Sequence, residues 1–260
     1  MPITHSEQLL ALEQDSFHKI DRRVTGMAFE AHNEIGRLLD ESIYQSALHQ
    51  AVVSAGLNCE RESEIRVTHK DFSKSYYIDL IVNGVIYETK ASKSLASLHE
   101  AQLINYLILT NTNHGKLLNF RPESVESRFV STKLTPQRRE TFQLTRISDN
   151  FPELMISSIR ELLEDWDTHL EVNLYRDALS HILNYTLEPV ELSYKGTHIG
   201  SQNMTIIEEK SALIVTAITS KTGFLSYETH LNRLLKMTHL TSFQWVNFNK
   251  HEITIKTLVK

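Results

Sequence analysis

The stretch Tyr77–Lys90, with the sequence YIDLIVNGVIYETK, predicts a two-stranded β-hairpin that decides the fold. Asn83 and Gly84 separate two β-branched runs, and this pair is the strongest short-range signal for a two-residue type I′ turn, because both central residues need a positive φ. Counting back from the turn places Asp79 opposite Glu88. Two carboxylates that face each other across a ladder repel. We therefore expect a cation between them, and a divalent metal ion is the natural candidate.

The face of the hairpin that carries the carboxylates predicts a chemistry. Lys90 shares the face of Glu88, because side chains alternate along a strand, and Thr89 points away. Asp79 and Glu88 would hold Mg²⁺ or Mn²⁺, with the main-chain carbonyl of Thr89 as a further ligand. Lys90 would orient a metal-bound water or stabilise developing negative charge during phosphodiester hydrolysis. By spacing alone, a solvated ladder of ion pairs is the simpler interpretation, and further residues favour the metal site.

Composition sets the frame for this site. A chain of 260 residues with 41% hydrophobic content can form one large domain or two small ones. It has no apolar run of about 18 residues, and its first residues, MPITHSE, lack the pattern of a signal peptide, so we expect a cytoplasmic protein without membrane association. The single cysteine, Cys59, excludes an internal disulfide and a cysteine-rich metal site. A net charge of −5 argues against non-specific coating of nucleic acid, although it permits a local basic cleft.

Hydrophobic periodicity predicts the elements around the hairpin. Apolar residues at steps of three and four indicate a long helix over 17–38, and a second helix ends near Gly56. The remaining predictions are strands at 64–68, 76–82 and 85–91, a helix at 98–109 and a closing strand at 115–120. The order is helix, three antiparallel strands, helix, strand.

The second half of the chain repeats this order with similar residues at nearly fixed offsets. Tyr44 corresponds to Tyr175, and Asn119-Phe120 corresponds to Asn247-Phe248. We therefore expect an α/β fold of two tandem units, each a small mixed sheet flanked by helices. The units would cover residues 1–130 and 151–260. We interpret residues 131–150, with four basic residues, as a solvated linker, and a phosphate-contacting segment is the alternative.

The repeat predicts that the second unit has lost the site. Asp79 corresponds to Met204, and the matches of the other two site residues, 88 and 90, are Thr216 and Ile218. The two-residue turn also becomes a longer one through residues 208–211. The second unit keeps the scaffold without the charged groups.

Polar residues on the helices complete a recognisable set. Gln102 and Tyr106 lie one helical turn apart after His99, and Glu41 and Tyr44 are spaced three apart on an earlier helix. With the hairpin, this set resembles the GxxExxY family of the PD-(D/E)XK, restriction-endonuclease-like, nuclease superfamily over residues 20–130. The family's glycine three residues before the glutamate falls on a leucine here, with a glycine two residues further back.

The resemblance implies roles for these residues. The hairpin triad Asp79, Glu88 and Lys90 matches the catalytic positions of the superfamily, and Glu41 matches a helix glutamate that joins the metal shell, directly or through water. The glutamine and tyrosine at 102 and 106 resemble the Gln-x-x-x-Tyr motif of RecB-type nucleases, in which the glutamine lies near the active site. His99 could contact a phosphate, although a histidine near a helix start is as often a cap.

These patterns favour a Mg²⁺- or Mn²⁺-dependent nuclease with one active site per chain, acting on DNA more readily than RNA. Because members that cut both strands commonly pair two sites, one site per chain predicts nicking or end-directed digestion unless the chain forms a homodimer. The degenerate second unit would serve packing or substrate binding. The alternative is a non-catalytic scaffold of the same fold that binds nucleic acid or protein, which the acidic charge favours.

Overall fold

The computed structural model describes residues 3–5, 9 and 11–260. They form two compact units. The first holds the described residues up to Val67 together with Lys74–Pro136, and the second holds Thr68–Ser73 together with Gln137–Lys260. The N-terminal stretch 1–7, on which the signal-peptide interpretation depends, lies largely outside the described residues. Among the helices that are described, none has the length and apolarity needed to cross a membrane.

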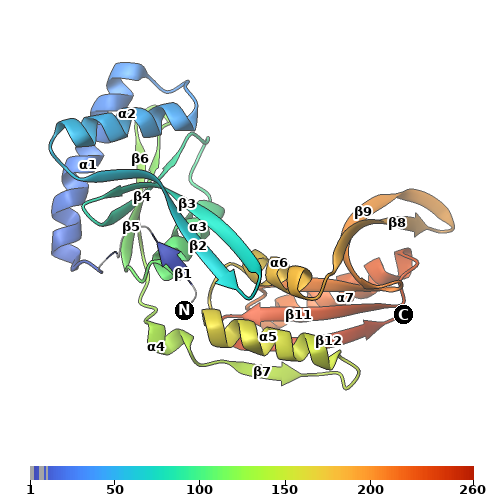
Figure 1. Ribbon diagram of the computed structural model, residues 1–260. Helices are drawn as coiled ribbons and strands as arrows, with labels where there is room; N and C mark the ends of the chain where they lie inside the picture. The colour runs from blue at the N-terminus through green and yellow to red at the C-terminus, as the bar shows by residue number, and fades with distance from the viewer. Residues whose placement is uncertain (1–2, 6–8, 10) are drawn as a thin grey trace. The chain divides into compact units, whose positions relative to one another are not determined.

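The first unit is a six-stranded sheet with helices (Figure 1). Its helices are α1 (Gln14–Ile35), α2 (Glu41–Ser54) and α3 (Ser97–Leu109). Its strands, in sheet order, are β1 (Ile3–His5), β2 (Cys59–His69), β3 (Phe72–Val82), β4 (Val85–Lys90), β5 (His114–Asn119) and β6 (Glu126–Ser131). Strands β4 and β5 run parallel, whereas β3 pairs with β4, and β5 with β6, in antiparallel fashion.

The expectation that a strand ending near residue 120 closes this unit is wrong. Strand β6 pairs with β5 from His114↔Ser131 to Asn119↔Glu126, and β1 pairs with β2 at the other end. Edge strands depend on pairing with a neighbour more than on a pattern of their own. The segment at β6 buries only one residue, Val130, so it carried little alternation to detect.

The predicted hairpin turn is confirmed. Asn83 has φ 46° and Gly84 has φ 84°, so both central residues adopt the left-handed conformation that the turn requires. Val82 pairs with Val85, and the register continues to Leu80↔Tyr87. This register brings the next residue of β3, Asp79, to the level of Glu88.

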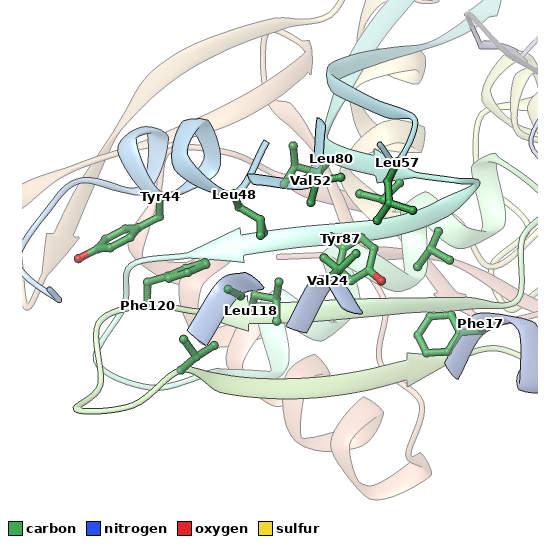
Figure 2. Packing of buried hydrophobic residues seen from close by; sticks show 14 residues of the cluster. Phe17, Val24, Tyr44, Leu48, Val52, Leu57, Leu80, Tyr87, Leu118 and Phe120 are labelled. Carbon is green, nitrogen blue, oxygen red and sulfur yellow. The ribbon is translucent and has the colours of Figure 1, made fainter. Parts of the chain in front are cut away.

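One face of the first sheet packs against α1 and α2. Figure 2 shows Val24 of α1 and Leu48 of α2 on the side chains of Tyr87 in β4 and Leu118 in β5. All four are fully buried. Because Tyr87 points into this core, its neighbours along β4 point to the opposite face of the sheet.

The junction between α1 and α2 is fixed by a buried tyrosine. The Tyr44 hydroxyl donates to the Gly36 carbonyl at 2.8 Å and accepts from the Leu39 amide at 3.1 Å. Its ring stacks on Phe120, with centroids 4.7 Å apart. Gly36 ends α1 with φ 77° and ψ −165°, a conformation that essentially only glycine adopts without strain. The turn that leads into Glu41 is therefore built from this glycine and this tyrosine.

The second unit is also a six-stranded sheet with helices. Its strands, in sheet order, are β7 (Gln143–Arg146), β12 (Glu252–Val259), β11 (Ser242–Asn249), β10 (Ser211–Thr216), β9 (Thr197–Glu208) and β8 (Thr186–Tyr194). Its helices are α5 (Glu153–Trp166), α6 (Val172–Ile182) and α7 (Lys221–Met237), and the short α4 (Pro136–Arg139) precedes β7. Strands β10 and β11 are parallel, as β4 and β5 are in the first unit.

The second unit reproduces the tyrosine junction. The Tyr175 hydroxyl donates to the Asp167 carbonyl at 2.7 Å, again eight residues back, and its ring stacks on Phe248 with centroids 4.5 Å apart. Asp167 ends α5 with φ 60° and ψ −161°, nearly the conformation of the glycine that ends α1. The bond from the hydroxyl to the carbonyl eight residues back and the stacking on a phenylalanine thus recur around two tyrosines in the chain.

The segment 131–150 contains ordered elements. Strand β7 pairs in parallel with β12, from Gln143↔Glu252 to Arg146↔Ile255. Arg139 is only 1% exposed, with Asp167 3.8 Å away, so the expectation of a solvated segment does not hold at this arginine.

The turn between β9 and β10 differs from the expectation. Glu208 pairs directly with Ser211, which leaves a turn of two residues rather than a longer one. The register then shifts between Ser211 and Ala212, because Ala212 pairs with Ile206. A β-bulge of this kind adds one residue to a strand. The sequence match had attributed that extra residue to the turn.

Candidate active site

Glu88 and Lys90 lie at the C-terminal end of β4, on the sheet face opposite the core of α1 and α2. Glu88 is 1% exposed and Lys90 is 8% exposed. Charged side chains are almost never buried to this degree unless they are paired. The end of β4 is therefore a place where the fold keeps ionisable groups away from water.

The Lys90 ammonium joins three groups. Its Nζ donates to Glu88 Oε1 at 2.6 Å, to the Thr89 carbonyl at 2.8 Å and to Glu41 Oε1 at 3.4 Å. Glu41 is the first residue of α2, so the cluster joins the start of this helix to the end of β4. The lysine thus touches two of the predicted metal-holding carboxylates and the predicted main-chain ligand.

Asp79 is held by β4 rather than by the lysine. Its Oδ2 accepts from both the amide and the hydroxyl of Thr89, each at 2.7 Å. The Thr89 side chain therefore does not simply point away, as alternation along the strand had led us to expect. Burial raises the pKa of Asp79 above its ordinary value, and the two bonds from Thr89 oppose that rise.

Glu88 has a buried oxygen without a protein partner. Its Oε1 meets the lysine, but Oε2 is buried and makes no hydrogen bond among the described residues. Burial, and next the charge of Asp79, raise the pKa of Glu88 to about 8. A buried carboxylate oxygen with no donor costs free energy, so this oxygen is suited to a ligand that the protein itself does not supply.

The cluster holds its protons tightly. Burial disfavours the ammonium of Lys90, but the charges of Glu88, Asp79 and Glu41 outweigh it and raise the pKa of this lysine. The neighbouring carboxylates thus favour the protonated form of Lys90, whereas burial, and next the charge of Asp79, favours the protonated form of Glu88. An additional cation would favour the ionised form of Glu88.

Two residues that the sequence analysis did not single out support the cluster. Arg121 donates to the carbonyls of Ala91 and Leu39, at 3.3 and 3.2 Å, and Glu41 Oε2 accepts from the Ala91 amide at 3.1 Å. The peptide after the lysine is thus tied to the turn before α2 from both sides. Gln45, 4% exposed, donates to the Asp79 carbonyl at 3.4 Å. The only sequence signals for these residues are their positions beside the motifs at 119–120 and 44.

Gln102 and Tyr106 pair with each other on α3. The Gln102 side-chain amide donates to the Tyr106 hydroxyl at 3.0 Å. Burial, and next the charge of Glu88, raise the pKa of Tyr106 to about 12. The tyrosine therefore lies within electrostatic reach of the carboxylate cluster, and the glutamine is linked to the cluster through it.

His99 occupies a capping position. Its Nδ1 accepts from the Ala96 amide at 3.2 Å, one residue before α3 begins at Ser97. This bond satisfies one of the amides that a helix start leaves without a partner. The substrate role of His99 stays a prediction beside this local structural role.

The described residues fit a divalent cation through donor chemistry rather than through a finished site. Within them, no group of three or more histidine, cysteine, aspartate or glutamate side chains is arranged to hold a metal ion. The ammonium of Lys90 lies against Glu88 and the Thr89 carbonyl, where a cation would bind, and Asp79 is turned toward Thr89. The unpaired oxygen of Glu88 and the two other carboxylates are hard oxygen donors that suit Mg²⁺ or Mn²⁺.

Strand pairing changes which residues of the second unit correspond to Glu88 and Lys90 of the first. Lys90 pairs with Asn119, and Thr216 pairs with Asn247. Asn119 accepts from the Ser92 amide and donates to the Ser92 carbonyl, and Ser92 is two residues after Lys90. Asn247 makes the same two bonds with Ile218, which is two residues after Thr216. Thr216 is thus the counterpart of the lysine, in place of Ile218, and residue 214, an isoleucine, is the counterpart of Glu88. The shift of two residues follows from pairing and leaves no charged group at either position.

Comparison with known protein families gives a match within the first unit. The family model of the PD-(D/E)XK nuclease superfamily matches residues 18–130. The matched stretch runs from within α1 to within β6 and contains every residue of the cluster. A search of curated proteins found no matching relative.

Proposed function

We propose that the first unit is a Mg²⁺- or Mn²⁺-dependent nuclease that hydrolyses phosphodiester bonds of nucleic acid. The observation that carries this proposal is the buried Glu88, whose free oxygen lies in a cluster with Asp79, Glu41 and Lys90. The superfamily match over residues 18–130 supports the same chemistry. A ladder of solvated ion pairs, the simpler interpretation of the spacing, would not bury these groups.

Each residue has a role in this proposal. Asp79, Glu88 and the Thr89 carbonyl would hold the ion, with Glu41 joining directly or through water. The ion would polarise the phosphoryl group and lower the pKa of a bound water. Lys90, an ammonium on the same face, would stabilise the negative charge that develops on the phosphoryl oxygens. To do so it must leave the oxygens of Glu88 and Thr89 that it holds in the structure.

The α3 pair would orient the substrate side of this cluster. Gln102 and Tyr106 are joined at 3.0 Å, and the tyrosine ring is 5% exposed beside the ring of Tyr76, whose centroid is 6.3 Å away. A hydrogen-bonded pair with one buried member has restricted freedom to move, which favours positioning of a neighbouring group over general acid–base chemistry. We assign the pair to orientation of the scissile phosphate.

The second unit would be a silent copy of the first, produced by duplication. Its support is the recurring tyrosine junction and a recurring ion pair: Glu100 lies 3.3 Å from Arg128, and Glu228 lies 2.5 Å from Lys256, each between the helix and the last strand of its own unit. One active unit per chain predicts nicks or end-directed digestion. Cleavage of both strands at one place would require two chains to associate as a homodimer.

The alternative is a scaffold of the same fold that binds nucleic acid or protein without cutting it. The observation in its favour is that the Lys90 ammonium donates to Glu88 at 2.6 Å and also to the Thr89 carbonyl. In a scaffold this arrangement would be permanent. In a nuclease it would give way when a metal ion binds.

Cleavage assays separate the two. The full chain is incubated with linear duplex, nicked and single-stranded DNA and with RNA, in Mg²⁺, Mn²⁺ or a chelator, beside Asp79→Ala and Lys90→Ala. We expect metal-dependent cleavage by the wild type of at least one substrate, DNA before RNA, and its loss in both variants. Glu123→Ala, which removes a carboxylate of the first unit that is 90% exposed and outside the cluster, is the control and should cut normally. If wild type and variants act alike on every substrate, the chain is not a nuclease.

A further inference from the structure

The second unit contains a pocket where the first unit has its carboxylate cluster. The pocket has a volume of about 520 Å³ and is lined by residues of α6, β8, β9, β10 and α7. Met204 of β9 and Ile214 of β10 are among them, and these are the counterparts of Asp79 and Glu88. Leu234 of α7, also in the lining, stands in the place of the tyrosine on α3. Apolar residues of this pocket thus stand at the positions where the first unit has charged residues.

The pocket lining combines apolar, aromatic and polar residues. Met204 and Leu213 are in the lining and are 5% and 4% exposed. Two tyrosines, Tyr185 and Tyr227, also line it, and Tyr227 is 38% exposed. Side-chain amides come from the strand residues at 202 and 203. Apolar pockets with a few convergent polar groups, in the range of about 300–1,000 Å³, are typical of sites for small or planar ligands.

The charge of the pocket separates it from the metal cluster. Its only ionic lining residues are Arg176 and Asp177, and Arg176 donates to Asp177 Oδ1 through Nε at 3.1 Å and Nη2 at 2.8 Å. Arg176 remains exposed at the pocket edge. The lining therefore offers two phenol rings, two amides and one guanidinium, and its two ionic side chains carry opposite charges.

We propose that this pocket binds a base of a single-stranded nucleic acid. Tyr227 and Tyr185 supply aromatic surface on which a base can stack, and such stacking is tolerant of sequence. Gln202 and Asn203 supply donors and acceptors for the base edge, and Arg176 reaches the adjoining backbone phosphate. The inference rests on the proposed function in its choice of nucleic acid as the ligand. The second unit would then bind single-stranded nucleic acid, the class of substrate proposed for the first unit.

A tryptophan under the pocket offers a built-in reporter. Trp245 is 1% exposed, and its ring centroid lies 5.8 Å from that of Tyr227. The chain has two tryptophans, so a Trp166→Phe variant leaves Trp245 as the only indole emitter. A base stacked on Tyr227 should change the emission of Trp245, whereas binding elsewhere should not.

The test measures binding without cleavage. A labelled oligothymidylate is titrated with the full chain in a chelator, and its anisotropy is followed for the wild type, Tyr227→Ala, Tyr227→Phe and Tyr194→Ala. We expect Tyr227→Ala to weaken binding by about tenfold, because loss of one stacking ring removes the binding of about one base. Tyr227→Phe keeps the ring and should bind like the wild type. Tyr194→Ala removes a tyrosine that is 56% exposed and outside the pocket lining, so it should have no effect.

Two further arms distinguish the outcomes. Arg176→Ala should flatten the dependence of affinity on salt by the slope of one phosphate contact, about −0.7 for a single strand. Binding that is equal in Tyr227→Ala and wild type, that prefers duplex, or that is limited to a peptide or an apolar dye would overturn the inference. Because the chelator prevents metal-dependent cleavage, oligonucleotide binding at the pocket can succeed even where the nuclease assays fail, and the reverse also holds.

Discussion

Lys90 Nζ lies 2.6 Å from Glu88 Oε1, and both side chains are buried at the end of β4. The same ammonium bonds the Thr89 carbonyl at 2.8 Å. Two of the groups proposed to hold a metal ion are therefore already bound to a positive charge that belongs to the chain. Metal binding and the lysine contact compete, and this competition leads to the first prediction.

Lys90→Met should bind Mn²⁺ more tightly than the wild type and should not cut nucleic acid. The substitution removes the competing ammonium, and a unit charge a few ångströms from a divalent ion costs enough to change affinity by about tenfold or more. Isothermal titration calorimetry measures the change. Lys90→Arg keeps the charge and serves as the control. Unchanged or weaker Mn²⁺ affinity in Lys90→Met would show that the ammonium does not occupy the metal position.

Metal affinity should rise with pH up to about 8, the pKa to which burial and Asp79 raise Glu88 from its ordinary value of 4.5. Below that pH the ion must displace a proton, so affinity should change roughly tenfold per pH unit, and above it the curve should level off. Calorimetry in buffers of different ionisation enthalpy counts the released proton. Glu88→Gln should lose this dependence, and a flat profile in the wild type would contradict the raised pKa.

The raised pKa of Glu88 also predicts how the stability of the metal-free chain depends on pH. Because the folded chain holds a proton on Glu88 that the unfolded chain has lost, the stability contributed by this group is present below pH 4.5 and is lost as pH rises through about 8. Urea unfolding of the metal-free chain across this range measures the effect. A saturating divalent ion should reverse the trend, because it stabilises the ionised carboxylate.

Alanine substitutions at Gly36 and Gly26 should change the free energy of unfolding in opposite directions. Gly36→Ala places a side chain at φ 77° and ψ −165°, which should lower the free energy of unfolding by about 1–3 kcal/mol. Gly26 lies inside α1 with open space around an added Cβ, so Gly26→Ala should raise it by about 0.5–1 kcal/mol. Chemical denaturation compares the pair. Equal effects would refute the role assigned to the turn before Glu41.

Variants of His99 show whether this residue caps α3 only or also contacts the substrate. Loss of its bond from the Ala96 amide in His99→Ala should cost about 0.5–2 kcal/mol of stability. His99→Asn can accept the same bond and should restore the stability. If KM for the cleaved strand rises in both variants while only the alanine variant is destabilised, His99 also contacts the substrate; a KM change that follows stability alone leaves it a cap.

Local chemistry made the hairpin predictable. The Asn83-Gly84 pair admits few turns other than the one observed. The type of turn then determines which residues of β3 and β4 face each other. The spacing of glutamate and lysine on one face then follows from alternation. The long helices were predictable for a similar reason, because α1 buries a regular series of residues against the sheet.

Features that depend on distant partners were not predictable. Strand β6 is recognised by its pairing with β5, and the bulge between Ser211 and Ala212 by its pairing with β9. Arg121 supports the site through carbonyls of residues 91 and 39, which no spacing in the sequence brings together. The bond from Thr89 to Asp79 likewise depends on how the strand end bends rather than on which side chains alternate.

The central claim is that the end of β4 is a divalent-cation site. Anomalous scattering from Mn²⁺ in crystals of the chain tests it most directly. We expect one Mn²⁺ at Glu88, Asp79 and the Thr89 carbonyl, with Lys90 Nζ withdrawn from Glu88, and no such ion near Met204 of the second unit. Lys90 still bound to Glu88 in saturating Mn²⁺, with no ion at this position, would contradict it.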